Sequence, residues 1–365
     1  MKRVLILGGF LIVGVVAVIA LAQPVADDFY KPNLQLDKDI TASAGDVAIE
    51  PKFKGIAGDV FGYEVDFKAV RRGTTSDDGV PSDAFRRSEH WATAVDYKLD
   101  EDVLDGSSDL RLAVRYARMN FLLDNGDARY SGYIGPDMGP IKPTFHEVMP
   151  DGSRTEVNNI PGWDGINART INTNRQTQAN DPAAVAWFSI SDQSRLYDEV
   201  YFADYNAADQ RNYPGRFQDP VQLTLGLFPE FPAGAKLKIG ETINLRRRMP
   251  VGAVPGATTE YDVSYKLEKL YGTVTEPTAA RFSFTAVPVA REHTAQVNGL
   301  TVKFSAPDFQ GGTLLLDLAK GVPAHVHWSY ALKGTIAGDG KFTATFENEV
   351  DFTASLRSDR AKTPE

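Results

Sequence analysis

The sequence of 365 residues contains no cysteine. Disulfide bonds and a cysteine nucleophile are therefore excluded, and folding must depend on burial of an apolar core. The cysteine that carries the lipid of bacterial lipoproteins is absent too. Residues are 42% hydrophobic and 24% charged, which is typical of a globular protein, and the chain is long enough for two domains.

The chain also lacks an excess of positive charge: 39 lysines and arginines stand against 48 acids, which gives a formal net charge of −9. Nucleic-acid binding normally requires a basic face, so we expect no nucleic-acid partner. The one local basic cluster comprises Arg246, Arg247 and Arg248. Because it lies beside an alternating segment, we expect three solvated or strand-edge arginines there rather than a phosphate site.

The motifs of common enzyme classes are missing from the chain. There is no Gly-x-Ser-x-Gly elbow, no phosphate-binding glycine loop and no His-Glu-x-x-His. Of the five histidines, only His325 and His327 form a pair. Residues two apart on a strand share a face, so the pair is a weak candidate for a zinc or copper site. Alternation predicts instead that both histidines lie on the solvated face, with Ser329 and Lys333. We expect no metal site and no cofactor.

The N-terminus predicts export. Lys2 and Arg3 precede an apolar run over residues 4–22, and Ala20 and Ala22 are the small residues that a signal peptidase reads. The run is long enough to span a bilayer, so a cleaved signal peptide and a retained anchor both stay open. Either places the protein outside the cytoplasm: periplasmic, secreted or anchored to the outer side of the inner membrane. Export without cysteine fits a bacterial envelope.

Hydrophobic alternation with a period of two dominates from about residue 49 onward. This pattern is typical of antiparallel sheets with one buried and one solvated face. Turn residues at Asp124, Asn125 and Gly126, and again at 338–340, predict hairpins. A three-residue loop at 338–340 makes paired positions sum to 678, which predicts His327 opposite Asp351. The predicted fold is mainly β: a curved sheet, sandwich or half-barrel.

Similar segments recur at a nearly constant spacing. "VDYKL" from Val95 and "VSYKL" from Val263 lie 168 positions apart, "RLAV" and "RFSF" 170, and "TFHEVMPDG" and "TLLLDLAKG" 169. We interpret these matches as a tandem duplication into two similar β-units. The expected organisation is a signal or anchor at 1–22, a linker at 23–48, a first unit at 49–226, a second at 227–357 and a disordered tail at 358–365.

The first unit carries extra sequence at about 153–220, which we expect to be a mixed helix and loop insertion. Asp181 and Pro182 before "AAVAWF" are typical of a helix start. Residues 195–206 fit either a short helix or a strand. The insertion is rich in aromatic side chains, which provide stacking faces for a ligand or pin a cover onto the sheet. Its candidate binding residues are Trp163, Asp164, Trp187, Tyr197, Tyr201, Tyr205 and Tyr213.

One segment resembles a known group of proteins. Residues 227–242, "LFPEFPAGAKLKIGET", are similar to the Phe-Pro-x-x-Pro and Gly-Asp/Glu-Thr segment of uncharacterised, secreted bacterial β-proteins with two similar halves. That group usually has tryptophan after the threonine, where this chain has Ile243. The resemblance implies a two-repeat β plan and no particular activity.

Three functions remain open from the sequence. The missing motifs favour a non-catalytic envelope protein that binds a hydrophobic or polymeric ligand, or a partner protein, on the aromatic side of a curved sheet or through the insertion. The alternatives are an extracytoplasmic hydrolase with acidic residues in 153–220, and a structural surface component. A membrane contact is expected only through residues 1–22, if they are retained.

Overall fold

The structure is a computed structural model. It describes residues 29–77, 79–101, 110–124, 126, 128–134, 144–157, 170–171, 186–191, 196–201, 203–204, 224, 226–250, 258–297, 300–337 and 342–359. Among these residues, no helix is long and apolar enough to cross a membrane. The apolar run over 4–22 lies outside the described residues, as does most of the aromatic insertion.

Almost all regular structure in the described residues is β-strand. The strands are β1 (Val60–Asp77), β2 (Val80–Glu101), β3 (Leu110–Asp124), β4 (Arg129–Ile134), β5 (Thr144–Val148), β6 (Arg154–Val157), β7 (Thr170–Ile171), β8 (Ala186–Ile190), β9 (Leu196–Tyr201), β10 (Ala203–Asp204), β11 (Thr242–Pro250), β12 (Thr258–Gly272), β13 (Pro277–Pro288), β14 (Glu292–Val297), β15 (Leu300–Ser305), β16 (Asp308–Asp317), β17 (Val322–Ala337) and β18 (Thr343–Arg357).

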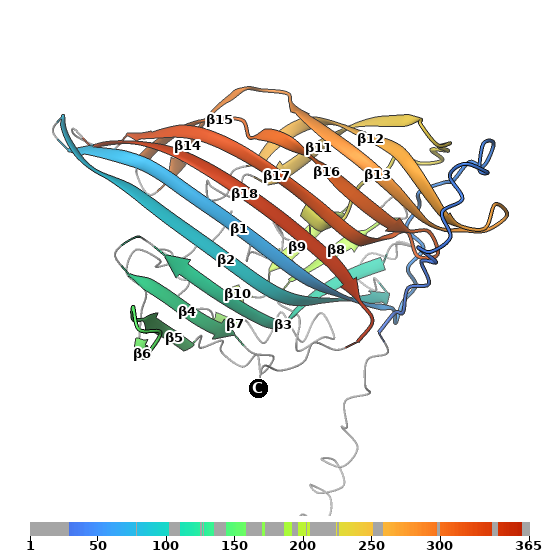
Figure 1. Ribbon diagram of the computed structural model, residues 1–365, viewed down its shortest axis with the longest axis horizontal. Helices are drawn as coiled ribbons and strands as arrows, with labels where there is room; N and C mark the ends of the chain where they lie inside the picture. The colour runs from blue at the N-terminus through green and yellow to red at the C-terminus, as the bar shows by residue number, and fades with distance from the viewer. Residues whose placement is uncertain are drawn as a thin grey trace, which may run out of the picture.

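Sixteen of these strands form one antiparallel sheet, which Figure 1 shows as a strongly curved surface. Its order is β11-β12-β13-β16-β17-β18-β1-β2-β3-β4-β5-β6, with β14 and β15 beside β17, and β8 and β9 beside β3. The predicted class, mainly antiparallel β with a curved sheet, is confirmed. Strands from both predicted units join in this sheet, because the last strand, β18, pairs with β1.

The two faces of the sheet differ as the alternation predicts. On β1, Phe61, Tyr63, Val65 and Phe67 are buried, and we call their side the inner face. The side chains between them, such as Asp66, point to the outer face. On β17 the alternate residues Val322 to Leu332 are buried, which leaves the predicted set of His325, His327, Ser329 and Lys333 on the outer face.

Phenylalanines and glycines face each other across neighbouring strands at four places. In each pair the ring lies where a β-carbon on the glycine would be. A larger residue would have to displace the ring, so these glycines are required by packing rather than by their backbone angles. The pairs are Phe85 with Gly73, Phe121 with Gly132, Phe284 with Gly312, and Phe346 with Gly334.

The segment from Thr224 to Phe231 packs across the inner face. The ring of Phe228 contacts Tyr63 and Tyr97 edge-on, with centroids 6.1 and 5.2 Å apart. Trp328 donates a hydrogen bond from Nε1 to the carbonyl of Gly226 over 3.1 Å. Arg247 is buried and donates to the Phe228 carbonyl and, over 3.2 Å, to the Tyr265 hydroxyl. The sequence predicts solvated or strand-edge arginines at 246–248. Arg247 does lie on β11, at one edge of the sheet, but its side chain is buried rather than solvated.

Residues 29–59 lie along one end of the sheet, which we call the base; they form the dark blue segment at the right of Figure 1. Tyr30 donates from its amide to the carbonyl of Val60, and Ile40 to that of Leu270. The amide of Lys54 donates to the carbonyl of Lys320. The base therefore includes the start of β1 and the turns at 273–276 and 318–321. The β1–β2 connection lies at the opposite end, the tip.

Two local predictions differ from the structure. The helix expected from Asp181 onward is wrong for Ala186–Ile190, which is strand β8. It pairs with the first half of β3 because β4 covers only the second half of that strand. In the last hairpin, paired positions sum to 680 rather than 678, because β17 and β18 pair from Ala337 and Thr343. His327 therefore faces Thr353, not Asp351.

Candidate functional site

The outer face of the four central strands, β2, β1, β18 and β17, carries the main cluster of charged side chains among the described residues. Strand register places them in rows that cross all four strands. One row reads Arg86, Arg72, Glu347 and Lys333, and another reads His90, Lys68, Asp351 and Ser329. Charges of both signs therefore alternate with short hydroxyl and alanine side chains on this surface.

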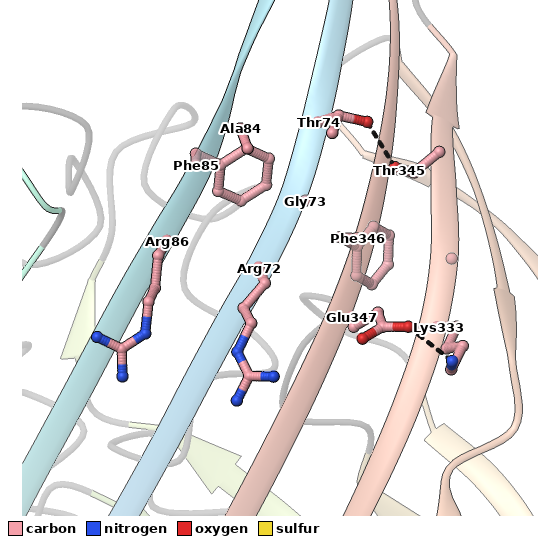
Figure 2. A pocket seen from close by; sticks show the side chains of 11 residues that line it. Arg72, Gly73, Thr74, Ala84, Phe85, Arg86, Lys333, Thr345, Phe346 and Glu347 are labelled. Atoms are coloured by element: carbon pink, nitrogen blue, oxygen red, sulfur yellow. Dashed lines mark hydrogen bonds and ion pairs between the residues drawn. The ribbon is translucent and has the colours of Figure 1, made fainter.

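A shallow depression of about 560 Å³ lies on these strands towards the tip. Figure 2 shows Arg86, Arg72, Glu347 and Lys333 side by side along it. Lys333 forms an ion pair with Glu347 over 2.6 Å. Hydrogen bonding to Lys333 lowers the pKa of Glu347, and the reverse contact raises that of Lys333. These charged forms are therefore favoured at neutral pH.

A second depression, of about 470 Å³, adjoins the middle of the same strands. Lys68, Ser329, Glu349 and Asp351 contribute to its lining, together with Gln310 from β16. Arg72 forms an ion pair with Glu349 over 3.2 Å, which places one cation between the two depressions.

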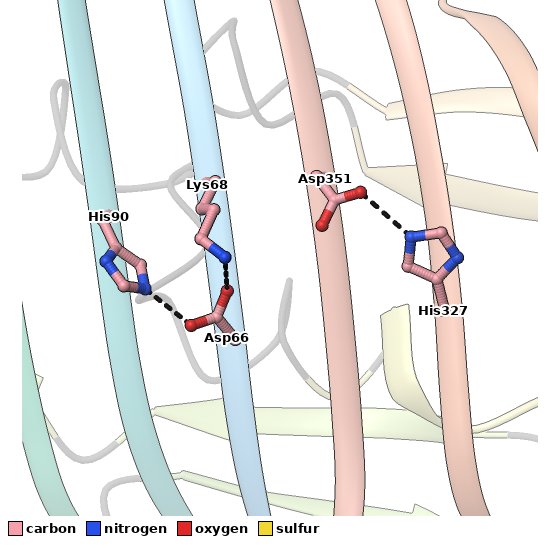
Figure 3. A network of polar contacts seen from close by, with 5 residues as sticks. All are labelled: Asp66, Lys68, His90, His327 and Asp351. Carbon is pink, nitrogen blue, oxygen red and sulfur yellow. Dashed lines mark hydrogen bonds and ion pairs between the residues drawn. The ribbon is translucent and has the colours of Figure 1, made fainter.

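Two histidine–aspartate pairs stand near the centre of the outer face (Figure 3). His90 Nε2 lies 2.6 Å from Asp66 Oδ2, and His327 Nε2 lies 2.9 Å from Asp351 Oδ2. The four side chains are between 38% and 46% exposed. Both contacts are diagonal, since His90 faces Lys68 and His327 faces Thr353. The predicted contact partner of His327 is thus correct although its register is not.

The two pairs are related by a local two-fold arrangement that the sequence repeats. "EVDFKA" from Glu64 on β1 matches "EVDFTA" from Glu349 on β18, and "HW" occurs at His90 on β2 and at His327 on β17. Phe67 faces Phe352 at the centre of the β1–β18 pair. In the strand register, a two-fold rotation about that point exchanges β1 with β18 and β2 with β17, and takes positions 66 and 90 to positions 351 and 327. Sequence analysis missed this site because it compared segments only at one tandem spacing.

Two opposing effects act on the pKa of Asp66. Partial burial raises it, but hydrogen bonds from Lys68 and His90 together lower it further, so the net pKa is below the usual value. The contact with Asp66 raises the pKa of Lys68. Burial, followed by the proximity of His327, lowers the pKa of His325, whose Nδ1 lies 2.9 Å from the Ser355 hydroxyl. The site is therefore a network of polar contacts that contains the Lys68–Asp66 ion pair and a histidine, His325, with a lowered pKa.

The histidines of the outer face have separate hydrogen-bond partners. In the part of the chain that the structure describes, no three histidine or acidic side chains are grouped to hold a metal. His325 and His327 each contact a different partner, Ser355 and Asp351. A catalytic dyad needs a nucleophile held against the histidine, as Ser355 is against His325, and also a site that limits water access. Both histidine–aspartate pairs stand on an open surface.

One small cavity on the inner face is lined by described residues. This cavity, beside Trp328, Arg247 and Tyr265, has a volume of about 10 Å³, no more than one water molecule requires. Of the predicted binding residues, Trp163, Asp164, Tyr205 and Tyr213 lie outside the described residues. Trp187 is on β8, and Tyr197 and Tyr201 are on the neighbouring β9. Three of the seven predicted binding residues therefore lie on β8 and β9, which pair with each other.

Comparison with known proteins finds no family and only low structural similarity. No protein-family model matches the chain, and no curated protein matches it. Among solved structures, lipovitellin is similar with a TM-score of 0.34 and 11% identity over 84% of this chain. The chain spans only 26% of the length of that protein. A second similar structure is the translocator domain of the autotransporter NalP from Neisseria meningitidis, with 8% identity and a TM-score of 0.14. The match covers 86% of this chain and 91% of that domain.

Proposed function

We propose that the protein is a non-catalytic, extracytoplasmic protein that binds a partner protein through the outer face of β2, β1, β18 and β17. The location is inferred from the apolar run at 4–22 after Lys2 and Arg3. One observation carries the binding role: a polar surface with two depressions and a two-fold related pair of histidine–aspartate contacts is open to solvent.

The size of this surface supports a protein partner. Strand β1 from Glu64 to Thr74 extends roughly 34 Å, and four strands cover about 19 Å in width, which gives on the order of 650 Å². A standard protein interface buries about 800 Å² on each partner. The surface also alternates charge signs over short distances, which supports recognition by a complementary pattern of charges rather than by net charge.

Other ligand classes are less well supported. A small hydrophobic ligand needs an enclosed apolar pocket, whereas the two depressions on the outer face are open and have charged side chains in their lining. A neutral polysaccharide usually stacks on exposed aromatic rings, whereas the rows of the outer face carry charged, hydroxyl and alanine side chains. The crosslinking experiment below distinguishes both of these ligand classes from a protein partner.

Site-directed photocrosslinking tests the proposal. The absence of cysteine lets a single substitution, Ser329→Cys, carry the crosslinker at a unique position on the outer face. Thr285→Cys, exposed on β13, is the matched control. In the native envelope we expect one discrete protein adduct from position 329 and none from position 285. Combining Ser329→Cys with Asp66→Lys and Asp351→Lys should abolish the adduct while the melting temperature stays within about 3 °C of the parent variant, because both acids are solvated.

Several results would reject the proposed role. Equal adducts from both positions would indicate non-specific contact, and an adduct that survives both charge reversals would show that the charge pairs do not recognise the partner. A glycan or lipid adduct would replace the protein partner by one of the other two classes.

A further inference from the structure

We infer that the base of the sheet rests on a lipid bilayer, with Leu36, Ile56 and Val274 in contact with the lipid. This inference rests on the extracytoplasmic location in the proposed function and on retention of residues 4–22 as an anchor, but it concerns a different surface from the partner site. Leu36 is 47% exposed, Ile56 62% and Val274 44%. These values are high for large aliphatic side chains.

Hydrogen bonds place the three side chains at the same end of the sheet. Leu36 lies in a turn whose flanking carbonyls, at Leu34 and Lys38, accept hydrogen bonds from Thr278 and Gly272. Those two residues bracket the turn at 273–276, which contains Val274. The turn that contains Leu36 is thereby held beside the turn that contains Val274.

Ile56 belongs to the adjoining part of the base. Its turn ends at Asp59, which forms an ion pair with Lys320 over 2.6 Å. Lys320 lies in the turn at 318–321. This turn is attached to β13, because the Leu318 amide donates to the carbonyl of Thr278 over 3.0 Å. The chain of contacts from Ile56 to Val274 therefore runs through neighbouring turns.

The length of the preceding chain selects a bilayer as the occupant of this end. Residues 4–22 are apolar and long enough to span a membrane. Only residues 23–28 separate them from Phe29, which is bridged to Val60 at the start of β1. Six residues reach at most about 20 Å, so the base cannot leave the vicinity of a bilayer that holds residues 4–22.

The tip of the sheet is too far from a bilayer that holds residues 4–22 to contact it. Strand β1 has 18 residues, so its far end at Asp77 lies roughly 58 Å from its start. Val80 and Val287 are also exposed, at 67% and 61%, but they lie at the ends of β1–β2 and β13 remote from the base. They are therefore matched controls for exposed aliphatic residues without bilayer contact.

Acidic lipid is not required for the contact. Two basic side chains at the base are paired with acids, Lys269 with Asp39 over 2.8 Å and Lys320 with Asp59, while Lys38 and Lys54 donate to neutral oxygens. Insertion of aliphatic side chains into the interfacial region depends on buried apolar area, which is available in zwitterionic lipid. Phosphatidylcholine vesicles are therefore the appropriate probe.

Depth-dependent quenching in the full-length chain tests this inference. Leu36→Cys, Ile56→Cys and Val274→Cys each receive an environment-sensitive fluorophore, and each protein is reconstituted in phosphatidylcholine vesicles with a quencher attached below the lipid headgroup. We expect fractional quenching at the three base positions to be at least twice that at Val80→Cys and Val287→Cys. Melting temperatures of the labelled proteins confirm that each variant is folded.

Two results would overturn the inference. Equal quenching at base and tip positions would show that the base has no fixed relation to the bilayer. Quenching at the base that falls when an envelope protein fraction is added would show that a protein, rather than lipid, occupies this end. Crosslinking from position 329 does not depend on base contact, so failure here leaves the proposed partner site standing.

Discussion

The buried ion pair between Asp96 and Arg357 joins β2 to the end of the last strand. Its side chains are only 9% and 7% exposed, and the guanidinium lies 4.9 Å from the ring centre of Phe29. Removing one member of a buried pair leaves the other charge without compensation. We expect Asp96→Ala to lower the free energy of unfolding by about 3 kcal/mol, measured by urea denaturation.

An exposed ion pair provides the control. Arg246 contacts Asp262 over 3.1 Å, but their side chains are 58% and 60% exposed. Asp262→Ala should leave the urea midpoint unchanged, since solvent screens such a pair. Equal losses in the two variants would contradict the claim that burial makes the Asp96–Arg357 pair important.

The phenylalanine–glycine pairs predict a second residue effect. In Gly312→Ala the new methyl group would overlap the ring of Phe284, so the sheet must shift or the ring must leave its position. Overpacking of this kind costs about 1–3 kcal/mol. Gly45→Ala is the control because no atom lies within 4 Å of its β-carbon position. Thermal melting should separate the two variants, and similar melting temperatures would refute the packing role.

The outer-face network predicts a dependence on acidic pH. The net lowering of the Asp66 pKa means that its charged form is stabilised by folding. This contribution is present above the usual aspartate pKa of about 3.9 and is lost as pH falls through the lower folded value. Because Asp66 is partly solvated, Asp66→Asn should lower the free energy of unfolding by less than about 1 kcal/mol at pH 6. At pH 2 the variant and parent should converge, and a constant difference across this range would contradict the assignment.

Sequence analysis predicted the side of the sheet for His325, His327, Ser329 and Lys333, because alternation alone determines it. It could not predict that Arg247 is buried. Arg247 sits at an alternate position of β11, but its partner, the carbonyl of Phe228, comes from a segment that crosses the inner face. A contact between an edge strand and a covering segment leaves no local signal in either sequence.

At the scale of elements, the last hairpin can be tested by cysteine pairs. The structure places Ser329 opposite Asp351, whereas the sequence predicted Glu349 at that position. Both registers keep the same faces together, so hydrophobic patterning cannot distinguish them. We expect Ser329→Cys with Asp351→Cys to form a disulfide under mild oxidation faster than Ser329→Cys with Glu349→Cys. The reverse order would favour the register that sums to 678.

The tandem duplication stays a proposal, and one element supports it. The turn before β1 and the turn before β11 both have a left-handed glycine, Gly58 and Gly240, followed by an acid that accepts a backbone hydrogen bond within the turn. Leu99 and Leu267, from the two "YKL" segments, bond to these turns in the same way.

Another of the three sequence matches does not support duplication. Gly152 follows β5, the fifth strand of the first meander, whereas Gly321 follows β16, the fourth strand of the second. The two segments therefore occupy different places in the sheet. Sequences of related chains would decide the question: relatives in which only one of the two glycine–acid turns can be found would count against duplication.

At the scale of the whole molecule, the sequence predicts strands but not how the two units join. The pairing of β18 with β1 links residues that are far apart in the sequence, from Ser76 with Thr343 to Gly62 with Arg357, and includes Phe67 with Phe352. Each strand has the same alternation that an edge strand would have, so nothing local marks them as partners. Only the repeated "EVDF" pattern distinguishes these two strands, and its meaning depends on knowing that they are adjacent.

This junction predicts that the sheet unfolds as one unit. Phe352 is fully buried on β18 and stacks on Trp328 with ring centres 4.7 Å apart, while its other neighbour, Phe67, belongs to the first unit. Phe352→Ala should cost about 3–5 kcal/mol through the cavity it leaves. Because that cavity borders strands of both units, calorimetry should show a single transition at a lower temperature. The matched variant Phe145→Ala, near the β6 edge, should also shift one transition. Two separate transitions, with only one affected by Phe352→Ala, would show instead that the units fold independently and meet only at their edges.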